Sequence, residues 1–401
     1  MAAQEYQAPE SVSRLQQRAY FVGGIALLVS IFGAVRAPEL FYPSYLMSFL
    51  LILGLTVGSL GLLMLQHLTS GHWGIIIRRP LESATRALPL MVIAFLPIAI
   101  FGMKYLYTGH EDEKGWLNAP LTGEGALSDF QKSYLTAHGF YTRAVIYFAI
   151  WLVLMFIFNI LSKQQDTNRE DRALRLRLKM LAGPGLILYV FAMTFAAIDW
   201  VMSLSPHWAS TIYGFLFVAG QLISSMALMI AVVVLLSRTE PFASALQKRH
   251  LHDLGKLLLA FVMLWAYFDF SQLLIIWSGN QPEEISFYRT RLYGGWGVVA
   301  VIVLVFHFFV PFFLLLSQDV KRNAKVLPKI AMWLIFMRLV DLFWMTRPEF
   351  TSRAVPTWLD VVLPLALGGL WLGLFAFNLK QQPLLPLGDP KLAEAIERHE
   401  H

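Results

Sequence analysis

Long apolar runs separated by short polar stretches dominate the chain. A helix needs about 20 apolar residues to cross the hydrocarbon layer of a membrane, and lipid forces each crossing segment to satisfy its own backbone hydrogen bonds. Runs of this length are too apolar for the strands of a barrel. The pattern therefore predicts an all-α integral membrane protein with ten transmembrane helices. We expect the helices at residues 18–35, 42–65, 84–107, 140–162, 180–202, 211–237, 255–277, 296–317, 327–345 and 358–378.

A weak internal repeat predicts two four-helix bundles plus two peripheral helices. The last helix of each proposed set carries an acid and a tryptophan, Asp199 with Trp200 in one and Asp341 with Trp344 in the other. Because each set has an even number of helices, the two repeats would be parallel. The expected division is a tail and first peripheral helix at 1–41, a first bundle at 42–202, a second bundle at 203–345, and the tenth helix with a tail at 346–401.

Composition narrows the chemistry that the chain can carry. Of its 401 residues, 57% are hydrophobic and 14% are charged, which is typical of a membrane protein and not of a nucleic-acid-binding one. The chain has no Cys, which excludes thiolate nucleophiles, Cys-ligated iron–sulfur clusters and covalently attached haem. Of the ten His, only His307 lies well inside an expected helix, so a haem with two His ligands is not expected. The sequence predicts no metal site and no covalently bound cofactor.

The positive charges predict an orientation in the membrane. Loops on the side of the two termini carry 18 Lys and Arg residues, and loops on the opposite side carry 7. Since loops rich in Lys and Arg stay in the cytoplasm, both termini are expected there. We interpret the basic segment 163–179 as a topology-setting loop, with a short basic helix along anionic headgroups as the alternative. On the opposite side, residues 108–139 either fold over a partner or form an ordinary solvated loop.

Ionisable residues deep inside the expected helices are the first candidates for chemistry. Each costs at least about 2.5 kcal/mol in lipid, so it usually faces a bundle interior and has a partner. Arg338 and Asp341 are three residues apart on one helix, which allows an ion pair. A structural salt bridge is one interpretation, and a proton relay through carboxylates and imidazole is the other. The candidates for the proton path are Asp269, His307, Arg338, Asp341, Gln221 and Tyr267.

A second candidate site lies where the fifth expected helix ends. Asp199, His207 and Trp208 are close in sequence there, and an acid, an imidazole and an indole can bind a quinol headgroup by hydrogen bonding and stacking. The alternative is an aromatic belt at the membrane interface beside a helix-end acid. No catalytic residue is predicted at either site.

Three stretches carry a resemblance to a known family. They are HLTSGHWGIIIRRPLESATRALPL (67–90), FAAIDWVMSLSPHWASTIYG (195–214) and HDLGKLLLAFVMLWAYFDFSQLLIIWSGNQPEE (252–284). They resemble the NrfD-like, or polysulfide-reductase-C-like, membrane subunits of bacterial alternative complex III, and in particular the smaller, ActF-like type. The resemblance extends over most of the chain and includes its length and its lack of Cys. The stretch around Asp199 also resembles the larger sister subunit.

The resemblance implies a place in a quinol:electron-acceptor oxidoreductase of the bacterial inner membrane. The implied partners are an ActC-like sister subunit, iron–sulfur and multihaem cytochrome subunits that hold the iron–sulfur and haem centres, small membrane-anchored subunits, and the lipid bilayer. Menaquinone or menaquinol is the implied small molecule. In such a complex this chain would be a subunit without its own redox centre and would not catalyse the reaction alone.

Three functions remain open on the sequence alone. The first is a subunit that scaffolds the complex and offers protons a path through the second bundle. The second is a menaquinol-binding subunit with its site on the periplasmic side, around Asp199. The third is a secondary transporter, with which parallel repeats and charges near the midplane are compatible.

Overall fold

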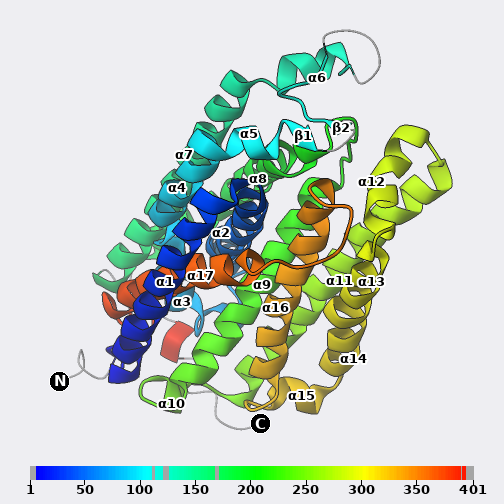
Figure 1. The fold of residues 1–401 in the computed structure, drawn as a ribbon. Coiled ribbons are helices and arrows are strands. Elements are labelled where there is room, and N and C mark those ends of the chain that lie inside the picture. Colours follow the sequence, from blue (N-terminus) through cyan, green and yellow to red (C-terminus); the bar gives the residue numbers. More distant parts are fainter. Residues whose placement is uncertain (1–5, 111–112, 121–125, 168–170, 390, 394–401) are drawn as a thin grey trace.

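The computed structural model of the chain describes residues 6–110, 113–120, 126–167, 171–389 and 391–393, and it is built almost entirely of helices (Figure 1). The first half contains α1 (Glu10–Arg36), α2 (Pro38–Thr69), η1 (His72–Gly74), α3 (Arg78–Thr85), α4 (Leu88–Pro97), η2 (Ile98–Gly102), α5 (Met103–Leu106), α6 (Asp129–Tyr134), α7 (Ala137–Thr167), α8 (Arg172–Trp200) and η3 (Met202–Leu204). The second half contains α9 (Tyr213–Leu236), α10 (Phe242–Ala245), α11 (Lys248–Gly279), α12 (Pro282–Leu292), α13 (Trp296–Val303), η4 (Leu304–Phe309), α14 (Val310–Leu316), α15 (Gln318–Arg322), α16 (Leu327–Thr346), η5 (Arg347–Glu349) and α17 (Leu359–Lys380). Two short antiparallel strands, β1 (Gly109–His110) and β2 (Glu113–Lys114), pair on the side opposite the termini.

Nine helical runs in the described part of the chain are long and apolar enough to cross a membrane. They coincide with nine of the ten expected segments. The remaining segment, 327–345, is helical as α16, but its 20 residues include Lys329, Arg338 and Asp341. α16 is therefore just long enough to cross a bilayer, and its three charges distinguish it from the other nine helices. The chain is therefore all-helical with nine candidate spans, and a tenth span stays a prediction.

Several helices begin earlier than their apolar runs, and two of these cases matter here because one of them corrects an interpretation of the sequence. The basic stretch 163–179 is mostly helix, since α7 continues to Thr167 and α8 begins at Arg172. The Asp171 side chain caps α8 by accepting a hydrogen bond from the Leu174 N–H at 3.1 Å. Likewise, α3 starts at Arg78, six residues before the expected segment. Hydropathy marks the part of a helix that is apolar, whereas the helix itself continues until its backbone bonding and caps end it.

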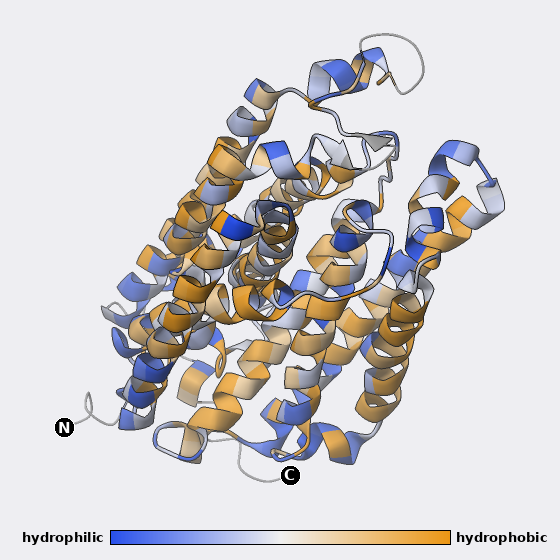
Figure 2. Ribbon diagram, viewed as in Figure 1, coloured by the Kyte–Doolittle hydropathy of each residue, from blue (hydrophilic) through white to orange (hydrophobic). Residues whose placement is uncertain are grey.

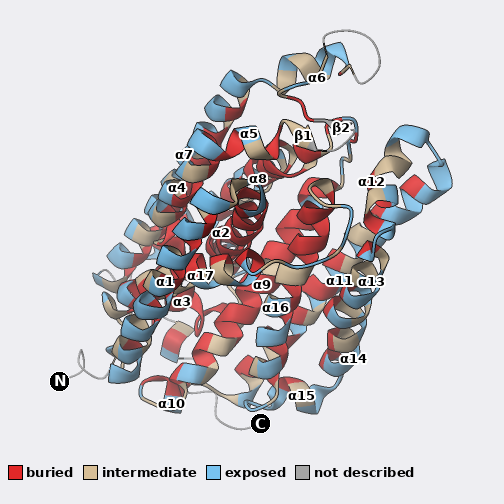
Figure 3. Ribbon diagram, in the orientation of Figure 1, coloured by how far each residue is buried: buried red, intermediate tan, exposed pale blue. Residues whose placement is uncertain are grey.

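The helices are arranged around two central ones, α2 and α9. Nearly every side chain of α2 from Phe41 to Met64 is buried, as are most of those of α9 (Figure 3). The outer helices expose large apolar side chains, among them Phe21, Val35 and Trp277, and Figure 2 shows apolar residues along the middle of the helices and polar ones toward their ends. An exposed apolar surface of this extent fits contact with lipid.

The helices of the two proposed bundles also contact each other. The first helices of the two sets, α2 and α9, pack together, and α16 touches both of them. The helix α1 lies along α17, which in turn packs on α2. Backbone bonding joins the two ends of the described chain, where the Leu384 N–H donates to the Tyr6 carbonyl at 2.8 Å. The division into two bundles stays a prediction.

The contact between α1 and α17 depends on backbone-to-backbone packing at Gly23. A methyl group added there would lie 2.7 Å from the Leu370 backbone nitrogen and 2.8 Å from the Gly369 carbonyl carbon, whereas one added at Gly24 would meet nothing within 4 Å. We expect Gly23→Ala to destabilise the protein by about 1–3 kcal/mol, the usual cost of overpacking. Gly24→Ala is the matched control and should be neutral or slightly stabilising. Thermal unfolding of both variants in detergent measures the difference, and equal melting temperatures would contradict the prediction.

Candidate functional site

A buried ion pair lies where α9, α11, α16 and the π-helical turn η4 meet. It joins Arg338 and Asp341, whose side chains are each 3% exposed, as their spacing on one helix allows. The guanidinium packs directly against Gly220, leaving no room there for a side chain, and lies 5.4 Å from the centre of the Phe217 ring. The pair is therefore enclosed by protein on the α9 side.

His307 belongs to the same cluster and is fully buried. Pro311 follows it by four residues and has no N–H to donate to the His307 carbonyl, which favours the π-helical turn at this point. The imidazole packs 4.5 Å from the Trp265 ring, centre to centre, and lies within electrostatic range of Arg338. The backbone of Met337 faces the ring, yet neither ring nitrogen is in hydrogen-bonding geometry with any described atom. The imidazole therefore lies between Trp265, Arg338 and the Met337 backbone, where it can take part in proton exchange.

A row of polar groups leads from this cluster toward the side opposite the termini. Asp269 on α11 lies close enough to Asp341 for their charges to interact, and it interacts in the same way with Tyr288 on α12. The row continues from the Gln272 amide, which donates to the Tyr288 hydroxyl at 3.4 Å, to Ser210, which donates to the Gln272 carbonyl oxygen at 3.0 Å. Among the described residues, Asp269 has no hydrogen-bond or ion-pair partner. It is thus the carboxylate of the row that can change protonation without breaking a pair.

Two of the expected proton-path residues do not join the cluster. Gln221 points toward the other half of the protein, where it accepts a hydrogen bond from the Tyr189 hydroxyl at 3.0 Å and packs against Gly54. Tyr267 faces outward and is 64% exposed. On α9 it is the neighbouring Gly220 that faces Arg338. Helical periodicity explains both cases, because residues one or two positions apart point in different directions.

The three residues suggested for quinol binding point in different directions. Asp199 is buried, and both of its oxygens accept hydrogen bonds from Arg143, at 2.8 and 2.9 Å. Tyr147 donates a further bond to it at 2.7 Å. Trp208 is buried and stacks on Phe287, with ring centres 3.9 Å apart, and His207 is exposed. The residues therefore form no single binding site.

An apolar cavity of about 310 Å³ lies beside this region. Trp208 and Tyr134 line it, whereas Asp199 and His207 do not. The Tyr134 hydroxyl is buried without a hydrogen-bond partner among the described atoms. Burial raises the pKa of this hydroxyl, with a smaller contribution from the nearby Asp199 charge, so the hydroxyl stays protonated. A cavity with this largely apolar lining can hold an apolar ring.

No protein-family model and no curated protein matches this sequence. The resemblance of the three stretches to NrfD-like subunits therefore stays an expectation.

One buried cluster escaped the reasoning from sequence altogether. Arg78 and Arg79 lie between two of the expected apolar helices, but both are 1% exposed and enclose Glu82, which accepts from Arg78 at 3.3 Å and from Arg79 at 2.6 Å. Ser162 donates to Glu82 at 2.5 Å, Arg79 also pairs with Asp166, and Arg78 also pairs with Asp389 at 2.9 Å. The sequence did contain a signal for these ion pairs, because Glu82 follows Arg79 by three residues and Arg78 by four, which places all three on one face of a helix.

A second missed cluster lies on the side opposite the termini. The Arg291 side chain is 1% exposed and pairs with Glu349 at 2.8 Å. It also donates to the Met345 carbonyl at 2.8 Å, and its guanidinium carbon lies 3.6 Å from the centre of the Phe287 ring. These contacts tie α12 to the end of α16. No local pattern predicts them, because the partners are distant in sequence.

Proposed function

We propose that the chain is an NrfD-like membrane subunit of a quinol:electron-acceptor oxidoreductase of the alternative complex III type. In this proposal it scaffolds the complex and offers protons a half-path through α9, α11, η4 and α16. The resemblance of residues 67–90, 195–214 and 252–284 supports the family. The partners would be an ActC-like subunit, iron–sulfur and multihaem cytochrome subunits and small membrane-anchored subunits, which would hold the redox centres.

The main support for a proton path is the row of polar groups that extends from the Arg338–Asp341 pair through Asp269 to Ser210. An intramembrane carboxylate without an ion-pair partner is costly and usually functional. An imidazole such as that of His307 can accept a proton on one ring nitrogen and release it from the other. On the side of the termini most buried side chains of the same helices are apolar, including Leu258, Ile230 and Leu334, and His250 near the start of α11 is an exception. The row of polar groups therefore serves one half of the membrane.

Replacing Asp269 with asparagine tests the path in the assembled complex. We expect Asp269→Asn to assemble normally but to lower the number of protons released per electron passed, because an amide cannot carry a proton in the row. The control is Tyr267→Phe, which removes an outward-facing hydroxyl from the same helix and should leave the ratio unchanged. Proton release coupled to quinol oxidation in proteoliposomes provides the measurement. An unchanged ratio in Asp269→Asn would overturn the proton path.

Membership of the complex has a separate test. Purification of the chain from native membranes in mild detergent should recover multihaem cytochrome and iron–sulfur subunits, identified by mass spectrometry, with a haem c signal in the reduced-minus-oxidised spectrum. A colourless, solitary chain would exclude this membership and favour the transporter interpretation. The quinol-binding alternative depends on the apolar cavity lined by Trp208 and Tyr134. Asp199 does not contribute to that cavity, because it is paired with Arg143.

A further inference from the structure

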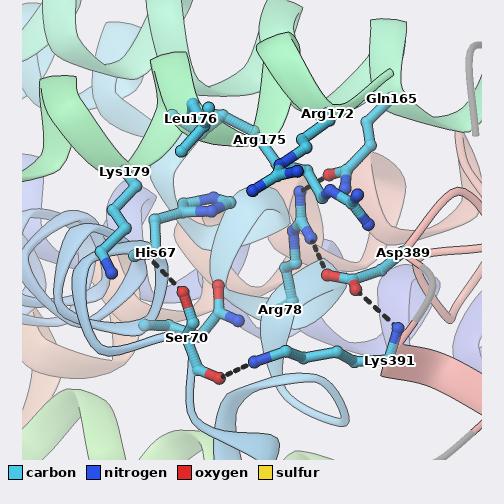
Figure 4. A pocket seen from close by; sticks show the side chains of 12 residues that line it. His67, Ser70, Arg78, Gln165, Arg172, Arg175, Leu176, Lys179, Asp389 and Lys391 are labelled. Atoms are coloured by element: carbon cyan, nitrogen blue, oxygen red, sulfur yellow. Dashed lines mark hydrogen bonds and ion pairs between the residues drawn. The ribbon is translucent and has the colours of Figure 1, made fainter. Parts of the chain in front are cut away.

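A strongly basic pocket opens on the side of the termini, between α2, α3, α8 and the segment after α17 (Figure 4). Its volume is about 250 Å³. Five cationic side chains and one acidic one line it, together with His67 and other polar groups. The charged residues are Arg78, Arg172, Arg175, Lys179, Lys391 and Asp389.

The pocket has an excess of positive charge that its own residues do not neutralise. Asp389 accepts from Arg78 at 2.9 Å. The Lys391 ammonium donates to the Ser70 carbonyl at 2.7 Å. Arg172, Arg175 and Lys179 form no ion pair with any described residue. Three cations therefore face one opening without a counter-charge from the described residues.

Two buried polar atoms in the pocket lack partners. The Nε2 atom of His67 and the Oε1 atom of Gln66 make no hydrogen bond with a described atom, although their residues are 7% and 4% exposed. Buried polar atoms are nearly always paired in folded proteins. Unpaired groups beside free cations indicate a site built for a polar, anionic ligand, and the Gln66 oxygen can accept a hydrogen bond from a ligand hydroxyl.

The surface next to the pocket favours a lipid as the source of the anion. The side chains at 172, 175, 176 and 179 recur at helical spacing and so share one face of α8, and Gly183 continues this face one turn further. Beside Gly183 the only atom that an added methyl group would meet is Leu68 Cδ1, at 3.9 Å. The neighbouring Leu176, Met180 and Leu68 are exposed apolar side chains. The face is thus basic at the start of α8 and apolar toward the membrane interior.

We propose that this pocket binds the phosphate of an anionic glycerophospholipid, with the acyl chains lying along α8 beside Leu68 and Met180. Arg175 and Lys179 neutralise the phosphodiester, and Gln66 accepts from a headgroup hydroxyl. Basic pockets between membrane helices on the cytoplasmic side are suited to such headgroups, and each Lys or Arg adds to the attraction. The proposal is independent of any role in a respiratory complex.

The test uses the full chain, purified in detergent and stripped of lipid. It is titrated with short-chain phosphatidylglycerol, short-chain phosphatidylcholine and inorganic phosphate, and binding is followed by thermal shift. Phosphatidylglycerol should stabilise the protein, and the other two should not at equal concentration. Equal stabilisation by inorganic phosphate would overturn the lipid as the occupant, and stabilisation by none of the three would overturn the site.

Matched variants on α8 locate the binding. Arg175→Gln should weaken binding of phosphatidylglycerol about 5-fold, and Arg175→Gln with Lys179→Gln on the order of 30-fold. The control is Arg177→Gln, which removes the same charge from an exposed position of the same helix outside the pocket. Without lipid, all variants should melt like the original protein, because these side chains form no ion pair or hydrogen bond with the part of the chain that the structure describes. Equal affinities of Arg175→Gln and Arg177→Gln would overturn the proposal.

Discussion

Glu82→Gln is expected to destabilise the protein by about 3–5 kcal/mol, the usual cost of removing one member of a buried ion pair. The reason is that Glu82 is the carboxylate shared by Arg78 and Arg79, and all three side chains are 1% exposed. An amide cannot balance two guanidinium charges in this interior. Thermal or denaturant unfolding in detergent measures the loss.

A carboxylate-to-amide change in an exposed pair is the matched control. Asp253 and Lys256 are also one turn apart on a helix, at 3.3 Å, but are 43% and 57% exposed. Asp253→Asn should cost less than about 1 kcal/mol, because water screens exposed pairs. If both variants lost the same small amount, the cluster around Glu82 would have no structural importance.

Asp341→Asn is expected to destabilise the protein by a similar amount, because it also removes the carboxylate from a buried ion pair. It leaves the Arg338 guanidinium buried against Gly220 and Phe217 without its ion-pair partner, at a cost of about 3–5 kcal/mol. Replacing both residues with apolar ones, Arg338→Met with Asp341→Leu, should restore most of the stability, since no charge then remains to be neutralised.

The comparison of the single and double variants isolates the ion pair. The double variant should be more stable than Asp341→Asn by at least about 2 kcal/mol, which corresponds to strong coupling between contacting residues. Unfolding in detergent gives the melting temperatures of all three proteins. A double variant as unstable as the single one would mean that packing, and not charge, sets the stability here.

Several features of the fold were predictable because they depend on local sequence. Nine of the ten expected helices are found as apolar helical runs, since a membrane span is set by the length of its apolar stretch. The Arg338–Asp341 pair was predictable as well, because residues three apart share a helix face. Helix ends were less predictable, as α3 and α8 extend into charged sequence.

The direction in which a helical side chain points was harder to predict. Gln221 and Tyr267 lie at suitable depths but on the wrong helix faces for the cluster, since Gln221 bonds to Tyr189 and Tyr267 faces outward. In an almost uniformly apolar helix the hydrophobic pattern does not single out a buried face. Asp199 is a similar case, because its partner Arg143 lies on another helix.

The sequence by itself determined the apolar helical runs typical of a multi-pass membrane protein and which charges lie within those runs. Only the tertiary structure decided which of these charges meet. It buries Arg78 and Arg79 around Glu82, brings Asp389 to Arg78 across more than three hundred residues of chain, and joins α2, α8 and the C-terminal segment into one basic pocket. The physical reason is that lipid selects apolar length locally, whereas a buried charge is stabilised only by partners that folding brings to it from distant parts of the chain.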